Sequence, residues 1–206
     1  MTNTIKALIF DLGNVIVNLN MRKFYKKILP KSDNKQINIY KDLWEPIEKL
    51  DKGLFSKEEF YQEAKKRFQF QDVGIEEFFN MFNSIFDSLN YKLLDFIKKL
   101  KQDKIYKVFA LSNTNPLHVE FLAKNIIDFR DYFNQVFYSF ELGRIKPDPK
   151  IFSHVLEHIN YKPSECIFID DNRKNVKVAE QIGMIGIQFR NETKFLEEIN
   201  DLLNIS

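Results

Sequence analysis

Apolar residues in the second half of the chain follow two alternating patterns, which predict strands and helices in turn. From about residue 91 onward, short apolar runs of strand type alternate with amphipathic segments of helical period. Four strands are expected there, at Tyr106 to Leu111, Gln135 to Tyr138, Cys166 to Ile169 and Met184 to Phe189. Together with the apolar run from Lys6 to Phe10, this alternation is typical of an α/β fold with a doubly wound parallel sheet and helices on both faces.

Capping signals mark the helices between these strands. A helix from Tyr91 to Lys101 carries its apolar residues on one side. Asn115-Pro116 and Asp148-Pro149 each combine a capping residue with a proline in the first helical turn. A closing amphipathic helix is expected from about Phe195 to Leu203.

The pattern changes between Val17 and about Leu89, where no convincing strand is found and the apolar spacing is helical throughout. Ser56 and Glu59 have the spacing of a capping box that follows a turn at Gly53. A phenylalanine-rich helix is expected from about Ile75 to Phe86. We therefore predict a core domain of residues 1–17 and 90–206, into which a small helical cap domain of residues 18–89 is inserted.

The net charge and the cysteine content of the chain argue against some classes of protein, such as those that bind nucleic acid or membranes. The chain of 206 residues has 31 basic and 29 acidic residues, a net charge of +2, so no strong electrostatic attraction to nucleic acid or to membranes is expected. The single cysteine, Cys166, excludes an internal disulfide and suits a reducing compartment. We expect a soluble, cytoplasmic protein with a small-molecule partner, and the sequence indicates no particular oligomeric state.

Polar residues that could take part in catalysis or ligand binding follow four of the predicted strands. The carboxyl ends of parallel strands meet at one edge of the sheet, where ligands bind in such folds. Each feature alone has an ordinary structural explanation, as a helix cap or a solvated loop residue. In chain order they are Asp11, Ser112 with Asn113, Lys146, and Asp170 with Asp171.

Three converging carboxylates repel one another unless a cation lies between them. A magnesium ion held by carboxylates, water and a substrate phosphate is the simplest solution. Lys146 adds a positive charge, while Ser112 and the backbone amides at the next helix start can bind phosphate oxygens. This set predicts phosphoryl transfer in which one oxygen of Asp11 attacks phosphorus and water then hydrolyses the aspartyl phosphate.

At this point the chain resembles the haloacid dehalogenase superfamily, in its phosphatase branch with a helical C1-type cap. The glycine in the first motif and the Ser-Asn-Thr-Asn run in the second are similar to the bacterial α-glucose-1-phosphate phosphatase subgroup. The motifs that carry the resemblance are Phe10-Asp11-Leu12-Gly13-Asn14-Val15, Leu111-Ser112-Asn113-Thr114-Asn115, Gly143-Arg144-Ile145-Lys146-Pro147 and Phe168-Ile169-Asp170-Asp171-Asn172.

The resemblance assigns a role to each motif residue. Asp11 would be the nucleophile and Lys146 the catalytic cation that also contacts phosphate. Ser112 and Asn113 would bind the phosphate. Magnesium would be held by the residues Asp11, Gly13 through its main-chain carbonyl, Asp170 and Asp171. The expected activity is hydrolysis of a small phosphorylated metabolite, such as a hexose 1-phosphate.

Gly13 departs from the superfamily's usual pattern, which has a second aspartate at this position. That aspartate protonates the leaving oxygen and later activates water, help that is typically worth about 100- to 10,000-fold in rate. An anomeric phosphate leaves as a comparatively acidic hemiacetal and needs this proton less. We therefore hypothesise a preference for activated leaving groups, with water or a cap carboxylate near Asp51 replacing the missing acid.

Four other functions share part of this residue pattern. A signalling receiver domain has its acidic pair after the first strand and its lysine last, in the opposite order. A haloacid dehalogenase would leave Asp171 without a purpose, and a phosphomutase needs the acid that Gly13 lacks. The remaining alternative is a non-catalytic phosphosugar-binding or interaction protein, although retention of Asp11 speaks against it.

Several conspicuous residues are interpreted as structural. The histidines His118, His154 and His158 lie on predicted helices and are expected to be surface or half-buried residues. Trp44 and the phenylalanines of the cap are expected to form its hydrophobic core.

Overall fold

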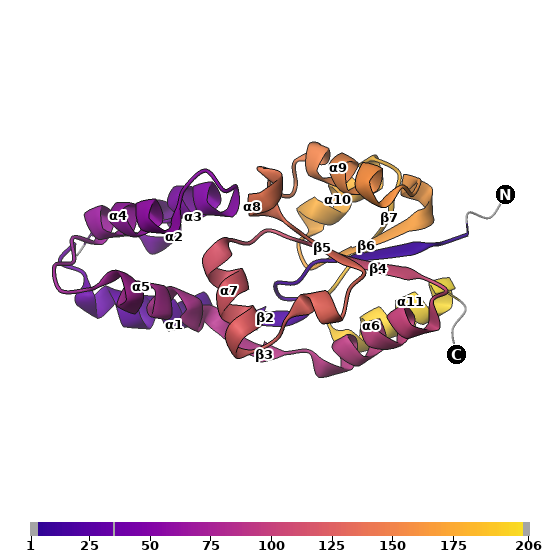
Figure 1. Ribbon diagram of the computed structural model, residues 1–206, viewed down its shortest axis with the longest axis horizontal. Helices are drawn as coiled ribbons and strands as arrows, with labels where there is room; N and C mark the ends of the chain where they lie inside the picture. The colour runs from indigo at the N-terminus through magenta and orange to yellow at the C-terminus, as the bar shows by residue number, and fades with distance from the viewer. Residues whose placement is uncertain (1–3, 35, 204–206) are drawn as a thin grey trace.

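A five-stranded parallel sheet forms the centre of the larger part of the molecule (Figure 1). The computed structural model describes residues 4–34 and 36–203. The strand order is β5-β4-β1-β6-β7, in which β1 is central and the chain winds outward on both sides of it. The strands are β1 (Ala7–Phe10), β4 (Lys107–Ser112), β5 (Gln135–Tyr138), β6 (Cys166–Asp170) and β7 (Ile185–Gln188). The predicted doubly wound α/β fold is thus present.

Two helices cover each face of this sheet. Because side chains alternate along a strand, Leu8 and Phe10 of β1 face one side and Ala7 and Ile9 the other. The first pair packs against α6 (Tyr91–Asp103) and α11 (Glu192–Leu203). The second pair packs against α9 (Pro149–Ile159) and α10 (Arg173–Gln181). Every residue of β1 is therefore buried, which explains its unbroken apolar sequence.

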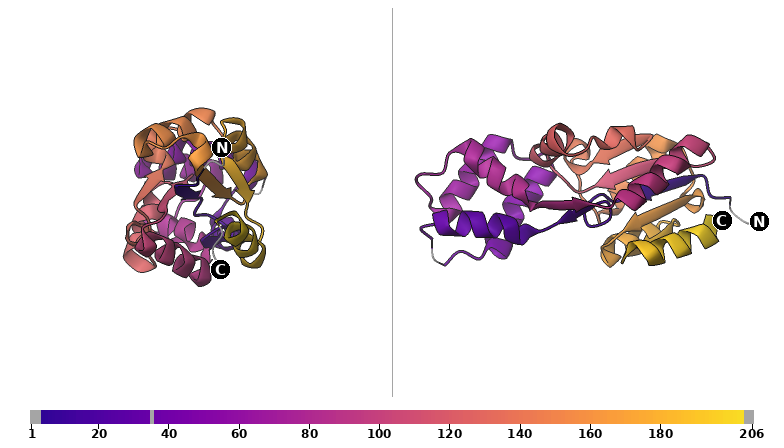
Figure 2. Two further views of the ribbon diagram at one scale, coloured as in Figure 1. Left: turned by 90° about the vertical axis from the view of Figure 1, so that its right-hand side faces the viewer. Right: turned by 90° about the horizontal axis from the view of Figure 1, so that it is seen from below.

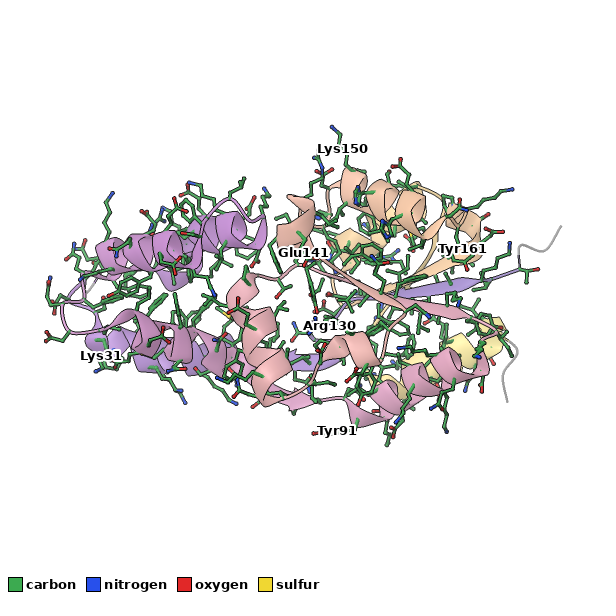
Figure 3. All side chains as sticks on the ribbon, in the orientation of Figure 1. Lys31, Tyr91, Arg130, Glu141, Lys150 and Tyr161 are labelled. Atoms are coloured by element: carbon green, nitrogen blue, oxygen red, sulfur yellow. The ribbon has the colours of Figure 1, made fainter. Side chains whose placement is uncertain are left out.

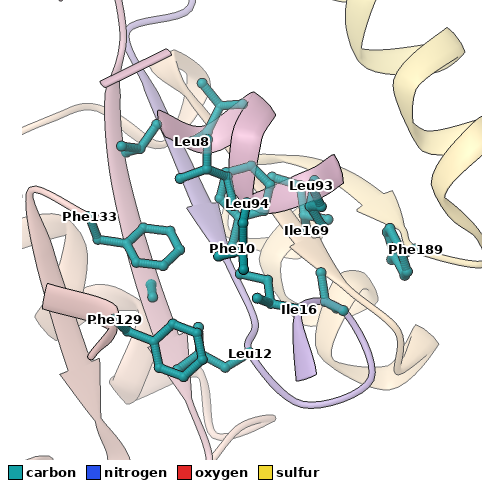
Figure 4. Close-up of a cluster of buried hydrophobic side chains, with 14 of the residues drawn as sticks. Leu8, Phe10, Leu12, Ile16, Leu93, Leu94, Phe129, Phe133, Ile169 and Phe189 are labelled. Atoms are coloured by element: carbon teal, nitrogen blue, oxygen red, sulfur yellow. The ribbon is translucent and has the colours of Figure 1, made fainter. Parts of the chain in front are cut away.

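Aromatic rings fill the α6 side of this core. Figure 4 shows Phe10 between Leu93 and Leu94 of α6 and the ring of Phe133. Phe10 also meets Phe195 of α11 edge-on, at a ring-centroid distance of 6.0 Å. Several elements thus pack against the central strand β1 and fix its position. Asp11, the residue that follows β1, is therefore held rigidly as well.

The helices α1 to α5 lie at one end of the molecule and α11 at the other, as the right-hand view of Figure 2 shows. We propose that residues 18–89 form an inserted domain, which we call the cap. Its elements are α1 (Met21–Ile28), η1 (Leu29–Lys31), α2 (Ile39–Asp42), α3 (Trp44–Asp51), α4 (Lys57–Phe68), α5 (Ile75–Phe82) and η2 (Asn83–Ile85).

A hydrophobic cluster separate from those on the sheet holds the cap helices together. Its centre is Phe24, whose ring meets those of Phe68, Phe78 and Phe82 edge-on at centroid distances of 6.5, 6.0 and 5.5 Å. The predicted capping box is present, because the Ser56 hydroxyl accepts from the Glu59 amide and the Glu59 carboxylate accepts from the Ser56 amide.

The cap region is not helical throughout, which corrects the sequence-based expectation. Strand β2 (Val17–Leu19) pairs antiparallel with β3 (Phe86–Leu89) at the junction between the cap and the sheet. The expected helix to Phe86 therefore ends at Phe82, and Phe86 lies on a strand. Strands this short carry no readable alternation, and their partners lie about 70 residues apart in sequence.

Trp44 corrects a second expectation. It is 65% exposed instead of contributing to the cap core, while Phe24, Phe60, Phe78 and Phe82 are buried as predicted. Lys150 and Tyr91 likewise lie at the surface (Figure 3). Among the described residues, no helix combines the length and apolar character needed to cross a bilayer.

Shortening the central cap side chain should be costly. We expect Phe24→Ala to lower the free energy of unfolding by about 3–5 kcal/mol, because it removes a fully buried ring and leaves a cavity. Urea denaturation followed by circular dichroism measures this. The matched control Trp44→Ala should change stability by less than about 0.5 kcal/mol. Equal losses for the two variants would contradict the described packing of the cap.

Candidate active site

Asp11 is the first residue after β1 and is held beside the end of β6. Its backbone amide donates to the carbonyl of Ile169 at 2.8 Å. Its carboxylate oxygen Oδ1 accepts from the Leu12 amide at 2.7 Å. The strand order reverses direction along the chain between β1 and β6, and this is where ligands bind in open α/β sheets. The sheet therefore positions Asp11 at its binding edge.

Lys146 lies between the carboxylates of two neighbouring strands. Its amine Nζ is 2.8 Å from Asp11 Oδ1 and 2.8 Å from Asp170 Oδ2, and it donates to the Leu111 carbonyl at 2.7 Å. An ammonium group has three N–H donors, and here all three have acceptors. Only 1% of the Lys146 side chain is exposed, so this cation is fixed in place.

Burial and neighbouring charges shift the pKa values of Asp11 and Lys146 in opposite directions. Burial raises the pKa of Asp11 to about 7, although the nearby Lys146 ammonium lowers it. Burial lowers the pKa of Lys146, but the carboxylates of Asp11 and Asp170 outweigh it and the pKa is raised. Lys146 is therefore charged at neutral pH. A further cation beside Asp11 would favour its ionised form.

Asp171 completes a group of three carboxylates. Asp11, Asp170 and Asp171 each offer an oxygen atom, and these atoms lie within 4.8 Å of one another. Burial, followed by the charge of Asp170, raises the pKa of Asp171. Three carboxylates and one ammonium leave two uncompensated negative charges. The donor set is all oxygen, which suits a hard divalent cation such as magnesium.

Asn175 belongs to this site and was missed in the sequence. Its amide nitrogen Nδ2 donates to both carboxylate oxygens of Asp170, at 3.0 Å each. The amide of Asn172 donates to Asp170 Oδ1 at 2.8 Å. Asn175 lies on α10, one turn after the motif, where an asparagine resembles any polar helix residue. Its Oδ1 is buried and has no hydrogen-bond partner among the residues that the structure describes.

Asn113 pairs with the backbone of Lys146. The Asn113 oxygen Oδ1 accepts from the Lys146 amide at 2.8 Å, and Nδ2 donates to the Lys146 carbonyl at 2.9 Å. Its side chain therefore holds the loop that carries Lys146. Ser112, the last residue of β4, is buried at the same edge.

The cap touches this edge through Asp51, at the end of α3. Asp51 Oδ1 accepts from Asn115 Nδ2 at 2.8 Å, and Asn115 caps α7 (Pro116–Asn125). The Asp51 carbonyl accepts from the Ser139 hydroxyl at 2.6 Å, where α8 (Ser139–Leu142) begins. Burial raises the pKa of Asp51 to about 7.

Comparison with known proteins identifies the family. The sequence matches the model of the haloacid dehalogenase-like hydrolase family over residues 5–183. The chain belongs to this family. The predicted superfamily, fold class and hydrolase activity are thereby confirmed.

Two curated relatives are hydrolases of phosphorylated compounds. A D-ribitol-5-phosphate phosphatase from Bacteroides thetaiotaomicron is 28% identical, over 97% of this chain and 99% of its own. A flavin mononucleotide hydrolase from Arabidopsis thaliana is 29% identical, over 76% of this chain and 62% of its own. This family member is thus similar to phosphatases with different named substrates.

A solved relative holds the expected ligands. A haloacid dehalogenase family enzyme from Bacteroides thetaiotaomicron was solved in complex with magnesium and inorganic phosphate. It superposes with a TM-score of 0.84 at 28% identity and covers 93% of this chain and 98% of its own. The predicted phosphatase activity and magnesium cofactor agree with these findings.

Removing the buried cation should destabilise the fold in a pH-dependent way. Without Lys146 the pKa of Asp11 rises further, so the folded state increasingly favours the protonated acid. The stability lost in Lys146→Met should therefore grow as pH rises from about 4 through neutrality, reaching about 3–5 kcal/mol at pH 8.

The measurement is urea unfolding at pH 5 and pH 8 in the presence of EDTA, which removes any bound metal. Lys150→Met, which changes an exposed lysine, is the matched control and should behave as wild type at both pH values. A loss in Lys146→Met that is the same at pH 5 and pH 8 would contradict this account of the site.

Proposed function

We propose that the protein is a magnesium-dependent phosphatase that hydrolyses a small phosphorylated metabolite through an aspartyl-phosphate intermediate. The observation that carries this proposal is the Lys146 ammonium, fixed between Asp11 and Asp170 with Asp171 beside them. A single nucleophilic carboxylate, a fixed cation and two further carboxylates are what such a reaction requires.

Asp11 is proposed as the nucleophile. Its Oδ1 is held by the Leu12 amide and by Lys146, which leaves Oδ2 as the attacking atom. Magnesium, held by Asp11, Asp170, Asp171 and the Gly13 carbonyl, would screen the charge of the approaching phosphate. Lys146 contributes a second positive charge, while Ser112 and the Asn113 amide orient the phosphate oxygens.

The leaving alcohol must obtain a proton, and Gly13 offers none. Asp51 is the carboxyl on the cap that contacts the phosphate-binding loop, through Asn115. Its pKa of about 7 lets it exist in both protonation states near neutral pH, as a general acid or base requires. Asp51 or water is therefore proposed in the role of the missing aspartate.

A sugar phosphate is the proposed substrate, with hexose 1-phosphates as the specific expectation. The argument rests on Gly13, because an anomeric leaving group is more acidic than a primary alcohol. The relative from Bacteroides thetaiotaomicron is named for a 5-phosphate, a primary ester. A cytoplasmic location is proposed from the single buried cysteine and the phosphorylated substrate.

Loss of the nucleophile should abolish turnover and leave the fold intact. We expect Asp11→Asn to reduce phosphate release by about a thousandfold or more, because an amide cannot form the phosphoryl-enzyme. Release is measured from a panel of sugar phosphates with magnesium and with EDTA, and EDTA should also abolish it. Asp87→Asn, an exposed carboxylate on β3, serves as control.

The same assay distinguishes the non-catalytic alternative. A phosphosugar-binding protein would bind these ligands without releasing phosphate, and Asp11→Asn would change nothing in the assay. Phosphate release that persists in Asp11→Asn would exclude Asp11 as the nucleophile.

Restoring an acid at position 13 should broaden the range of leaving groups. Within the described part of the chain, a Cβ at Gly13 would contact the Leu19 side chain, at 3.0 Å, and Leu19 is 37% exposed and able to shift. We expect Gly13→Asp to raise activity on hexose 6-phosphates relative to 1-phosphates, by up to about 100-fold.

Gly13→Asn has nearly the same size without the acid and is the matched control. The measurement is the ratio of kcat/KM on the two esters for wild type and both variants. If Gly13→Asp and Gly13→Asn give the same ratio as wild type, the glycine does not select the leaving group.

A further inference from the structure

Ser139 carries a buried hydroxyl to which the proposed mechanism gives no role. The residue directly follows β5, at the carboxyl edge of the sheet, and is 0% exposed. Tyr138, the residue before it, lies opposite Ser112 in the pairing of β5 with β4. The chain segments that leave these two strands therefore start side by side. Ser139 adjoins the loop of residues 112–115, whose first residues are proposed to bind phosphate.

The Ser139 hydroxyl lies within hydrogen-bonding distance of three backbone groups of the described chain. Its oxygen Oγ accepts from the Thr114 amide at 2.9 Å. Oγ is also 2.6 Å from the Asp51 carbonyl and 3.0 Å from the Thr114 carbonyl, and both of these groups are acceptors. A hydroxyl has one proton, so it can donate to only one of the two carbonyls at a time. The shorter distance assigns the proton to Asp51 in this structure.

The Asp51 carbonyl belongs to the cap turn, residues 51–53, which is packed closely on α8. The end of α3 lies next to α8 in Figure 1. A Cβ at Gly53 would overlap the carbonyl oxygen of Phe140, so the close approach requires glycine there. Gly53 also has a φ of +65°, which glycine adopts without strain. On its other side the turn binds Asn115 through the Asp51 carboxylate.

The cap also packs against the helix that follows the loop. Leu117 of α7 belongs to the hydrophobic cluster of the cap. His118 is buried, contrary to the expected surface or half-buried position, because Phe82 and Asn83 cover it. Its ring stacks on Phe82 at a centroid distance of 4.4 Å, and its Nδ1 lies 2.8 Å from Asn83 Oδ1. The cap therefore fixes the end of the loop where α7 begins.

We propose that Ser139 is a positioning residue that links docking of the cap turn to the geometry of the phosphate-binding loop. With the turn docked, the hydroxyl donates to the Asp51 carbonyl, which makes Oγ a stronger acceptor for the Thr114 amide. When the turn moves away, the same proton passes to the Thr114 carbonyl. The loop therefore has two hydrogen-bonded arrangements, and the position of the cap turn selects between them.

This inference rests on the proposed function, which places the phosphate on Ser112 and Asn113, directly before Thr114. In the docked arrangement the cap turn holds the loop at two points, through Ser139 and through Asn115. A loop that is already held in its binding geometry binds its ligand more tightly. We therefore expect the docked arrangement to have the higher affinity for phosphate.

Hydrogen exchange of the Thr114 amide, followed by NMR in the ligand-free protein, tests the contact itself. Ser139→Ala removes the acceptor and should speed this exchange about tenfold. Ser32→Ala is the matched control, because Ser32 is also buried and its hydroxyl lies 2.7 and 3.2 Å from two backbone carbonyls inside the cap. It should leave the exchange of Thr114 as in the wild type. An unchanged exchange rate in Ser139→Ala would refute the contact.

Displacing the cap turn tests the link between cap and loop. Gly53→Ala places a methyl group against the Phe140 carbonyl and should move the turn away from Ser139. We expect this change to speed exchange of the Thr114 amide about threefold, and to have no further effect when it is added to Ser139→Ala. Equal effects of Gly53→Ala with and without the Ser139 hydroxyl would overturn the proposal.

Two further variants keep this comparison decisive. Gly183→Ala also places alanine at a positive φ, +96°, but its Cβ would make an ordinary contact of 3.5 Å with Pro163. It controls for backbone strain and should leave Thr114 unchanged. If circular dichroism shows that Gly53→Ala unfolds the cap, Lys57→Met replaces it in the same comparison. Lys57 pairs with Glu120 of α7 at 2.8 Å, so its loss loosens the docked cap.

Binding of inorganic phosphate, measured by calorimetry with magnesium present, separates this inference from the proposed function. Ser139→Ala should weaken binding about fivefold to tenfold, and Ser32→Ala should not change it. Gly53→Ala should weaken binding only where the Ser139 hydroxyl is present. If the wild type binds no phosphate, the proposed function fails, and the exchange measurements still decide the role of Ser139. If phosphate binds and Gly53→Ala weakens it equally in both backgrounds, the inference fails and the phosphatase proposal stands.

Discussion

The burial of the Lys146 ammonium between two carboxylates is the interaction on which the site depends. Taking these charges out of water is costly, and the cost is offset because each of the three N–H donors of Lys146 has an acceptor. Leu111 and Asp170 belong to strands on either side of β1, so one amine connects the ends of three neighbouring strands. The position of the proposed nucleophile is thus determined by the sheet register.

Much of this arrangement could be predicted from the sequence because it depends on local signals. Apolar runs identified the five strands of the main sheet, and polar residues that follow four of these runs marked the carboxyl edge of the sheet. Parallel strands bring those ends together, which is why Asp11, Lys146 and Asp170 were predicted as one site. The Ser56 capping box was equally local and is present.

The missed features depend on contacts between distant segments. Strands β2 and β3 form because residues about 70 positions apart meet, and neither strand has a pattern of its own. Asn175 can donate to Asp170 only because α10 packs against the end of β6. Trp44 has the composition of a core residue but lies on the outer side of its helix. The side chain of Asn113 binds a loop that is 33 residues away in sequence.

The contact between Asp51 and Asn115 has a thermodynamic consequence. The same short loop, residues 112–115, contacts the cap through Asn115 and carries Ser112 and Asn113, which are proposed to bind the phosphate. A ligand that orders this loop lowers the entropy cost of docking the cap, and a docked cap lowers the cost of binding the ligand. The two events therefore have a coupling free energy that acts equally in both directions. A change in the cap far from the phosphate can accordingly alter phosphate affinity without touching it.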